Sequence, residues 1–296
     1  MGSRHLPVLV EEVVNLLRCE AHQTYVDATL GGGGHALKIL ERTSPDGILV
    51  GLDWDREAIV EAKRALASFE ERIKVFRENF IRLPDLMGAL KISEVDGILV
   101  DLGLSSLQLE KKERGFSLRG EGPLDMRMDQ RIERTAADLV MSLSSEDLEF
   151  TLQEFGEERW AKQIVKALIR EREKRPIETT QELRQIVHRV IPGRFHSRKI
   201  DPATRTFQAF RIRVNEELGN LRTILETGWT CLKRGGRICV ISFHSLEDRI
   251  VKEAFRRLEK DGVMRRVTKK PVVPSEEEKQ RNPRSRSAKL RCAERV

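Results

Sequence analysis

Residues 24–36 read Thr-Tyr-Val-Asp-Ala-Thr-Leu-Gly-Gly-Gly-Gly-His-Ala. A short β-prone run ends on Asp27, four glycines follow at positions 31–34, and a helix-like stretch occupies positions 35–42. Glycine adopts positive φ without strain and lets a ligand approach the backbone without meeting a Cβ atom. The order of strand, glycine turn and helix therefore predicts an α/β protein with a site for a nucleotide-like ligand at this turn.

The same alternation continues on both sides of the glycine turn. Apolar runs typical of buried parallel strands end on acidic residues, as in residues 48–52 before Asp53 and residues 97–100 before Asp101. A further strand is expected at 73–76, and helices are expected at 8–17, 56–69 and 83–90. This βαβαβαβ order predicts a doubly wound parallel sheet.

The alternation stops after residue 110 and resumes near residue 214. Residues 111–130 are rich in charge and glycine, and residues 135–191 have helical patterns with capping-box spacing at Ser144 and Thr179. We therefore predict an inserted helical subdomain at 111–213 within a sheet domain formed by 1–110 and 214–296. After the insertion, the patterns predict helices at 214–232 and 247–259, a strand at 237–242 and a last strand at 263–267.

The charge of the chain favours a polyanionic partner. The formal net charge is +7, and residues 265–296 hold eleven Lys or Arg and four Glu, a surplus equal to that of the whole chain. The four cysteines are scattered and form no Cys-x-x-Cys pair, which predicts free thiols in a reducing cytosol rather than a zinc site or disulfides. No membrane-spanning run or signal-peptide pattern is present, so a cytoplasmic location is expected.

Ligands of open α/β sheets bind beyond the carboxyl ends of the strands. Gly31-x-Gly33-x-x-Ala36 has dinucleotide-binding spacing, and Asp53 lies where an acid would bind ribose hydroxyls. Phe80, after the third strand, could pack on an adenine. The alternatives are that the glycines form a plain turn, that Asp53 is only a solvated carboxylate, and that Phe80 only packs in the core.

Two nucleotide ligands fit these residues, NAD(P) and S-adenosylmethionine. Asp27 precedes the glycines and suits a ligand with an ammonium or sulfonium charge better than a pyrophosphate. A P-loop is excluded because the sequence has no G-x-x-x-x-G-K-[ST], and no cluster has metal-ligand spacing.

Motifs along the whole chain carry a more specific resemblance. They are His5-Leu-Pro-Val-Leu, Asp27-Ala-Thr-Leu-Gly-Gly-Gly-Gly-His35, Asp101-Leu-Gly-Leu-Ser-Ser106, Arg114-Gly-Phe-Ser, Pro123-Leu-Asp-Met-Arg-Met128, Thr206-Phe-Gln-Ala-Phe-Arg-Ile, Ser242-Phe-His-Ser-Leu-Glu-Asp-Arg249 and Asn282-Pro-Arg-Ser-Arg-Ser-Ala-Lys-Leu-Arg291. In this order they resemble the MraW/RsmH family of bacterial 16S rRNA cytosine-N4 methyltransferases.

The resemblance implies a class I methyltransferase sheet with a helical insertion and S-adenosylmethionine as cofactor. It implies a substrate cytosine in the decoding-centre region of small-subunit rRNA, methylated on its exocyclic N4. The cofactor-binding residues that it implies are Gly33, Gly34, His35, Asp53, Phe80, Asp101 and Gln108.

The catalytic group is less defined. Many amino-methyltransferases have an Asp/Asn-Pro-Pro-Tyr/Phe motif after the fourth strand, where this chain has Asp101-Leu-Gly-Leu. Asp101 is placed to accept hydrogen bonds from the target amino group, although the resemblance also assigns it to the cofactor. Ser105, Ser106 and His244 are further candidates, and a structural hydrogen bond is the alternative for His244.

Basic clusters are candidates for rRNA phosphates. The first comprises Arg281, Arg284, Arg286, Lys289 and Arg291, and the second comprises Arg198, Lys199, Arg205, Arg211 and Arg213. The alternative for both clusters is ordinary solvated charge. The helical insertion could form a wall of an RNA cleft. The competing functions are an NAD-dependent oxidoreductase and a non-catalytic ribosome-assembly factor, although the latter would not need Gly33, Asp53 and Asp101.

Overall fold

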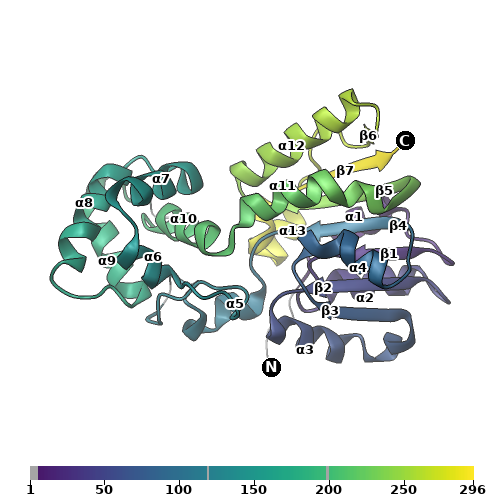
Figure 1. The fold of residues 1–296 in the computed structure, drawn as a ribbon, viewed down its shortest axis with the longest axis horizontal. Helices are drawn as coiled ribbons and strands as arrows, with labels where there is room; N and C mark the ends of the chain where they lie inside the picture. Colours follow the sequence, from purple (N-terminus) through teal and green to yellow (C-terminus); the bar gives the residue numbers. More distant parts are fainter. Residues whose placement is uncertain (1–5, 119, 198–199) are drawn as a thin grey trace. The chain divides into compact units, whose positions relative to one another are not determined.

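The computed structural model describes residues 6–118, 120–197 and 200–296. The chain divides into two compact units, a sheet unit formed by Met1–Ser105 and Leu218–Val296 and a helical unit formed by Ser106–Glu217 (Figure 1). The helical unit thus begins five residues before the expected insertion and ends four residues after it.

One seven-stranded sheet organises the sheet unit, and its strand order is β3-β2-β1-β4-β5-β7-β6. Neighbours from β3 to β5 are parallel, and β7 is antiparallel to both β5 and β6. The strands are β1 (Thr24–Asp27), β2 (Ile48–Asp53), β3 (Ile73–Arg77), β4 (Val95–Asp101), β5 (Leu232–Ser242), β6 (Met264–Arg266) and β7 (Lys289–Arg295). The predicted doubly wound parallel sheet is confirmed.

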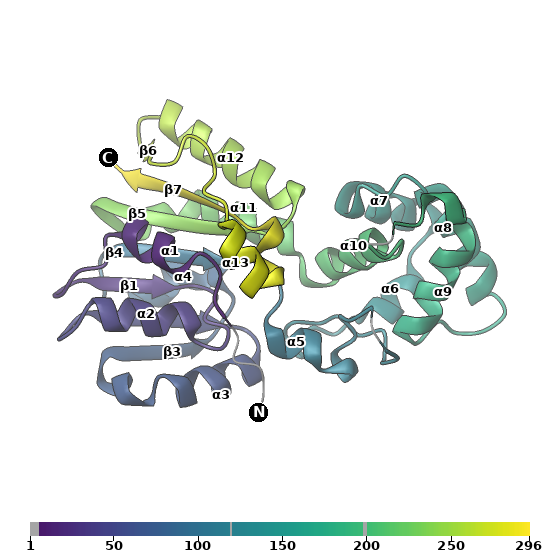
Figure 2. The same ribbon diagram turned by 180° about the vertical axis from the view of Figure 1, so that it is seen from behind.

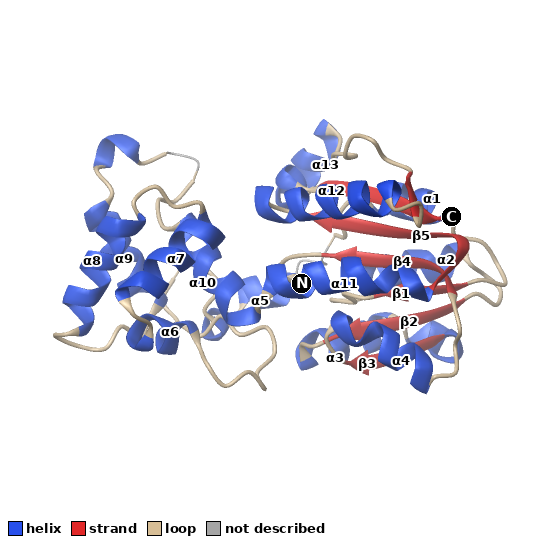
Figure 3. Ribbon diagram, turned by 45° about the horizontal axis from the view of Figure 1, so that its top comes forward, coloured by secondary structure: helices blue, strands red, loops and turns tan. Residues whose placement is uncertain are grey.

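Helices cover both faces of this sheet (Figures 2 and 3). One face packs against α4 (Leu83–Ala89), α11 (Glu217–Thr227) and α12 (Ser245–Lys260), and the other against α1 (Val10–Leu17), α2 (Gly34–Arg42) and α3 (Arg56–Ala65). Consecutive strand residues alternate between the two cores, as Val26 and Tyr25 do in β1. Burial on both faces explains why these strands are continuous apolar runs in the sequence.

Strand β7 is the element that the sequence analysis missed. It lies between β5 and β6, where Leu290 and Cys292 enter the core of α1 and α2 while Ala293 enters the other core. The sequence predicts a basic tail over 265–296 and no strand after residue 267. The tail also contains helix α13 (Glu276–Arg281) and β6, which matches the strand expected at 263–267.

The helical unit is built from α5 (Ser106–Glu110), α6 (Ala136–Ser142), α7 (Ser145–Gly156), α8 (Ala161–Arg172), α9 (Thr180–Val190) and α10 (Thr204–Asn215). The Thr179 side chain accepts a hydrogen bond from Glu182 N in a complete capping box, and Ser144 caps α7 by accepting from Asp147 N. These caps fix the helix starts that the sequence predicted. In the described ranges of the chain, no helix is both long and apolar enough to cross a membrane.

Candidate cofactor and catalytic site

Three carboxylates gather at one edge of the sheet, on the last residues of three neighbouring strands. Asp27 ends β1, Asp53 ends β2 and Asp101 ends β4. In the sheet order β2-β1-β4, Asp27 lies beside Gly51 of β2 and Leu99 of β4. The parallel direction of the strands therefore brings the three acids to the edge where ligands of this fold class bind.

The Asp53 carboxylate holds the glycine loop in place. Its Oδ2 accepts a hydrogen bond of 2.8 Å from Gly31 N, and its Oδ1 accepts one of 2.8 Å from Asp55 N. The residue predicted to bind ribose hydroxyls therefore also shapes the turn that precedes α2.

Close packing disfavours a side chain at two positions of the loop. Gly33 has φ of 83°, and a Cβ atom there would lie 3.1 Å from Leu66 Cδ1 and 3.3 Å from Ala62 Cα. A Cβ on Gly34 would lie 3.0 Å from Pro7 Cγ. The loop is consequently pressed against α3 on one side and the chain before α1 on the other, which leaves its shape little freedom.

His35 connects the glycine loop with Asp101. Its Nε2 lies 2.8 Å from the carbonyl oxygen of Val8, and its Nδ1 lies 3.5 Å from Asp101 Oδ2. Since a carbonyl only accepts hydrogen bonds, Nε2 carries the proton, and Nδ1 of the neutral ring is an acceptor that faces the carboxyl group. His35 is thus placed to share a proton with Asp101.

The second carboxylate oxygen of Asp101, Oδ1, lacks a hydrogen-bond donor in the described structure. Asp101 Oδ1 is buried and has no hydrogen-bond partner among the described residues, whereas the backbone nitrogen of Asp101 donates to Thr29 Oγ1 at 2.6 Å. A buried carboxylate oxygen without a donor is costly, so a ligand donor at this position would stabilise the site.

Burial makes all three acids hard to ionise. It raises the pKa of Asp27 to about 7 and the pKa of Asp53 to about 6. Burial raises the pKa of Asp101 well above its usual value, and the charges of Asp27 and Glu247 add to the effect. A cationic ligand would favour the ionised forms, so the edge has the electrostatics of a site for a sulfonium or ammonium group.

His244 and Glu247 form the start of α12. His244 Nδ1 accepts a hydrogen bond of 3.4 Å from Glu247 N, and Glu247 Oε2 accepts one of 3.3 Å from His244 N. This capping box, with histidine as the N-cap residue, supports the structural alternative for His244.

Phe80 is only 9% exposed and packs in the core formed with α4, α11 and α12. Its ring centroid lies 6.5 Å from that of Trp54, which directly follows Asp53. Most of the Phe80 side chain is therefore buried in the core, which was the alternative to packing on an adenine. Trp54 is not among the residues predicted for the site, although its position immediately after a strand-end acid was a usable signal.

The remaining candidates for the cofactor and for catalysis lie near or beyond the end of the sheet unit. Gln108 is on α5 in the helical unit, where it is 3% exposed. Ser105 is the last residue of the first segment of the sheet unit, and the side chain of Ser106 lies outside the described part of the structure.

The predicted RNA-binding residues of the tail divide into two groups. Arg281, Arg284 and Arg286 are exposed on α13 and on the 3₁₀ helix Pro283–Ser287. Lys289 and Arg291 belong to β7, and both bind Asp248, with distances of 3.0 Å from Nζ to Oδ2 and 2.7 Å from Nε to Oδ1.

The second basic cluster lies in the helical unit and has mostly internal partners. Arg211 binds both oxygens of Glu217, and Arg205 Nη1 donates to Glu157 O at 2.8 Å. The guanidinium carbon of Arg213 lies 6.0 Å from the ring centroid of Phe155. Positions 198 and 199 lie outside the described residues.

Together, the sheet order, the antiparallel β7 and the acid-rimmed glycine loop define a class I methyltransferase. Residues 2–296 match the MraW methylase family, and the chain belongs to this family.

Relatives of similar length support the assignment. A protein from Syntrophus aciditrophicus (strain SB) is 46% identical over 309 residues, which cover 99% of this chain and 98% of that protein. One from Caldicellulosiruptor saccharolyticus is 48% identical over 307 residues, covering 99% of each chain, and one from Clostridioides difficile (strain 630) is 42% identical over 311 residues, covering 100% of each. All three are named "Ribosomal RNA small subunit methyltransferase H".

The cofactor of this methyltransferase is S-adenosylmethionine, which decides between the two nucleotide ligands left open by the residues. Its sulfonium and ammonium charges fit the three acids at the sheet edge, whose pKa values are all raised. Membership of a methylase family also excludes the two competing functions, an NAD-dependent oxidoreductase and a non-catalytic assembly factor.

Proposed function

We propose that this chain transfers the methyl group of S-adenosylmethionine to the exocyclic N4 of a cytosine in the decoding-centre (P-site) region of 16S rRNA. The relatives' shared name supports small-subunit rRNA as the substrate. The cytosine, its N4 atom and its position come from the motif resemblance. The observation that carries the chemistry is Asp101 Oδ1, a buried acceptor without a partner in the described structure.

The N4 amino group of cytosine is a poor nucleophile because its lone pair is delocalised into the ring. A hydrogen bond from N4–H to Asp101 Oδ1 would favour a pyramidal nitrogen and align its lone pair for in-line attack. When bound, S-adenosylmethionine supplies the electrophilic methyl group. The raised pKa of Asp101 suits this carboxylate to accept the departing proton, and His35 Nδ1, 3.5 Å from Oδ2, can share it.

We assign cofactor binding to Gly33, Gly34, His35, Asp53, Phe80, Asp101 and Gln108. The loop glycines would present backbone to the ligand, Asp53 would offer carboxylate oxygens to the ribose, and Phe80 would pack against the adenine. Because the Asp53 carboxylate already holds Gly31 N, ribose binding and loop geometry would depend on one side chain.

We further propose that the tail binds rRNA phosphates through Arg281, Arg284, Arg286, Lys289 and Arg291, with the exposed first three contributing most. The helical unit would provide a further RNA-binding surface. A basic tail gives affinity that falls with salt, as expected for contacts to phosphates.

The decisive experiment follows tritium from labelled S-adenosylmethionine into small subunits that lack the modification, with nucleoside analysis of the product. Label at cytosine N4 supports the proposal, whereas label in protein, on ribose or on a ring carbon contradicts it. Asp101→Asn should lower kcat by roughly 10²–10⁴-fold and weaken cofactor binding much less.

A matched control for Asp101→Asn is Asp85→Asn, the same change at an acid whose side chain is 65% exposed. Equal losses of kcat and cofactor affinity in Asp101→Asn would mean that Asp101 only binds the cofactor.

A further inference from the structure

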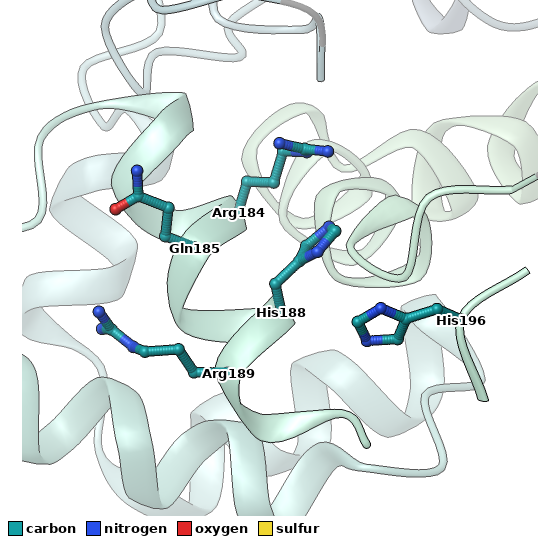
Figure 4. A pocket seen from close by; sticks show the side chains of 5 residues that line it. All are labelled: Arg184, Gln185, His188, Arg189 and His196. Carbon is teal, nitrogen blue, oxygen red and sulfur yellow. The ribbon is translucent and has the colours of Figure 1, made fainter. Parts of the chain in front are cut away.

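The helical unit contains an open hollow of about 540 Å³ beside α9. Figure 4 shows four of its lining side chains on this helix and the fifth, His196, on the segment that follows, facing the ring of His188. The lining consists of Arg184, Gln185, His188, Arg189 and His196. The hollow thus presents two guanidinium groups, an amide and two imidazoles, and none of its lining side chains is acidic.

Asp201 binds two of these groups, Arg184 and His188. Its Oδ2 accepts a hydrogen bond of 2.7 Å from Arg184 Nε, and its Oδ1 lies 2.8 Å from His188 Nε2. Arg189 is held more loosely, since its Nη2 lies 3.5 Å from Glu171 Oε2 and 61% of its side chain is exposed. The guanidinium of Arg189 can therefore turn to a phosphate at little cost.

The two imidazoles have defined hydrogen-bonding roles. His188 Nε2 faces a carboxylate, and His196 Nε2 lies 2.8 Å from the carbonyl oxygen of Ile191. Both partners accept, so in each neutral ring Nε2 carries the proton and Nδ1 is an acceptor. An acceptor beside arginines suits the 2′-hydroxyl of a ribose next to its phosphates.

An aromatic pair with one exposed ring, Phe195, lies next to the lining residue His196 in the sequence. Phe195, the neighbour of His196 in sequence, is 55% exposed, and its ring centroid lies 5.4 Å from that of Trp160. The guanidinium carbon of Arg194 lies 5.0 Å from the Phe195 ring centroid. Exposed aromatic rings beside arginine are the usual platforms on which unpaired bases stack.

We propose that this surface of the helical unit binds a single-stranded stretch of RNA. A base stacks on Phe195, the adjoining phosphates contact Arg184 and Arg189, and the ribose contacts His188 and His196. The inference rests on the proposed function, because it assumes an RNA substrate, and adds to it a particular contact surface and a preference for unpaired RNA.

Fluorescence anisotropy of the full chain with a labelled single-stranded oligoribonucleotide tests this surface. Phe195→Ala should weaken binding by roughly 5- to 150-fold, the range for loss of one stacked base. The matched control is Phe150→Ala, since Phe150 is a similarly exposed phenylalanine (51%) on α7 of the same unit. Equal affinities of the two variants would overturn the stacking role.

The charge contribution is measured as a salt dependence. Arg189→Ala should reduce the slope of log affinity against log salt by about 0.7, the value for one phosphate of a single strand. Lys162→Ala, on α8 with 75% of its side chain exposed, removes the same charge from the same unit and should leave the slope unchanged. Equal slopes for the two variants would overturn the phosphate role.

The ribose contacts predict that the wild type binds the oligoribonucleotide several-fold more tightly than the DNA strand of the same sequence. Equal binding of the two strands would overturn the ribose role. A wild type that binds the RNA strand in this pattern but methylates no small subunit would contradict the proposed function alone. Normal methylation by the wild type, with no effect of the surface variants on RNA binding, would contradict this inference alone.

Discussion

Affinity for S-adenosylmethionine should rise steeply between pH 5 and pH 8, and Asp27 should be the main cause. Burial raises the pKa of Asp27 to about 7, and the charge of Asp53 adds to this. An acid of that pKa is about 1% ionised at pH 5 and about 90% ionised at pH 8. Because the cationic cofactor favours the ionised form, proton and cofactor compete for the site.

The size of the effect follows from the change in ionised fraction. If only the ionised form binds, affinity falls about 90-fold from pH 8 to pH 5, or about 2.7 kcal/mol at about 1.36 kcal/mol per tenfold change. Burial also raises the pKa of Asp53 to about 6, so this carboxylate adds a second loss below pH 6.

Stability without cofactor should change in the opposite direction. The pKa of Asp27 is higher in the folded state than the ordinary value of 3.8, so between pH 4 and pH 7 the native state binds more protons than the unfolded state. Unfolding free energy therefore falls as pH rises through this window, by up to about 4 kcal/mol from Asp27. Added cofactor should restore stability most effectively above pH 7.

Isothermal titration calorimetry from pH 5 to pH 8 measures the effect directly. Asp27→Asn should bind the cofactor weakly at pH 8 and show a much flatter profile between pH 6.5 and pH 8, whereas Asp85→Asn should follow the wild type. S-adenosylhomocysteine, which has a thioether in place of the sulfonium, should show a smaller pH dependence. A wild-type affinity that is the same at pH 5 and pH 8 would refute the electrostatic argument.

Two further predictions concern stability and are checked by urea unfolding. Gly33→Ala should lower the free energy of unfolding by about 2–4 kcal/mol, because the new side chain adds left-handed backbone strain to close contacts with Leu66. Gly235→Ala has the strain alone, with φ of +80° and open space around the residue, and should lower it by only about 1–2 kcal/mol. Similar losses in the two variants would contradict the packing argument. Arg291→Ala should lower the free energy of unfolding by about 2–3 kcal/mol, because it removes a buried arginine and leaves the partly buried Asp248 with Lys289 alone. Arg286→Ala, at an exposed position, should change it by less than about 0.5 kcal/mol. An unchanged unfolding midpoint in Arg291→Ala would show that this arginine has no structural role.

The strands that build the site were predictable because their signal is local. Each of β1, β2 and β4 ends on an acid that directly follows buried apolar residues, and burial on both faces favours such residues. The glycine loop was predictable from its four consecutive glycines. The structure gives the reason for one of them, since Gly33 has a positive φ and little room for a Cβ atom.

Strand β7 was not predictable in this way because its charges are neutralised by distant residues. Arg291 binds Asp248 of α12, and Glu294 binds Arg237 of β5 at 2.9 Å and Arg265 of β6. In the sequence these residues look like a solvated basic tail. Only the fold shows that the five consecutive residues 290–294 of the strand are buried, with Leu290 and Cys292 in one core and Ala293 in the other.

The pairing of His35 with Asp101 was likewise hidden, because each residue had a sufficient explanation alone. His35 follows the glycines and Asp101 ends a strand 66 residues later, so their proximity depends on the parallel pairing of β1 with β4. The sequence could propose Asp101 as an acceptor, but it could not show that one oxygen lies near a histidine while the other has no donor in the described structure.

Two acids elsewhere in the sheet unit differ from those of the site, because each is paired with cations that lower its pKa. Burial acts to raise the pKa of Asp248, but hydrogen bonds from Arg291 and Lys289 outweigh it and the pKa is lowered. At Glu294, Arg237 and Arg265 outweigh burial in the same way.

No such compensation is found in the described structure for the acids at the carboxyl edge, where the pKa values of Asp27, Asp53 and Asp101 are all raised. A chain with 54 Lys and Arg does not lack cations to pair with them. Asp27 is fully buried and Asp53 and Asp101 are partly buried. Leaving these carboxylates without a Lys or Arg partner lowers the stability of the free protein, and the cost is offset when a positive ligand binds. The missing cations thus argue for a cationic cofactor at this edge independently of the glycine loop, because the loop by itself would equally suit a dinucleotide.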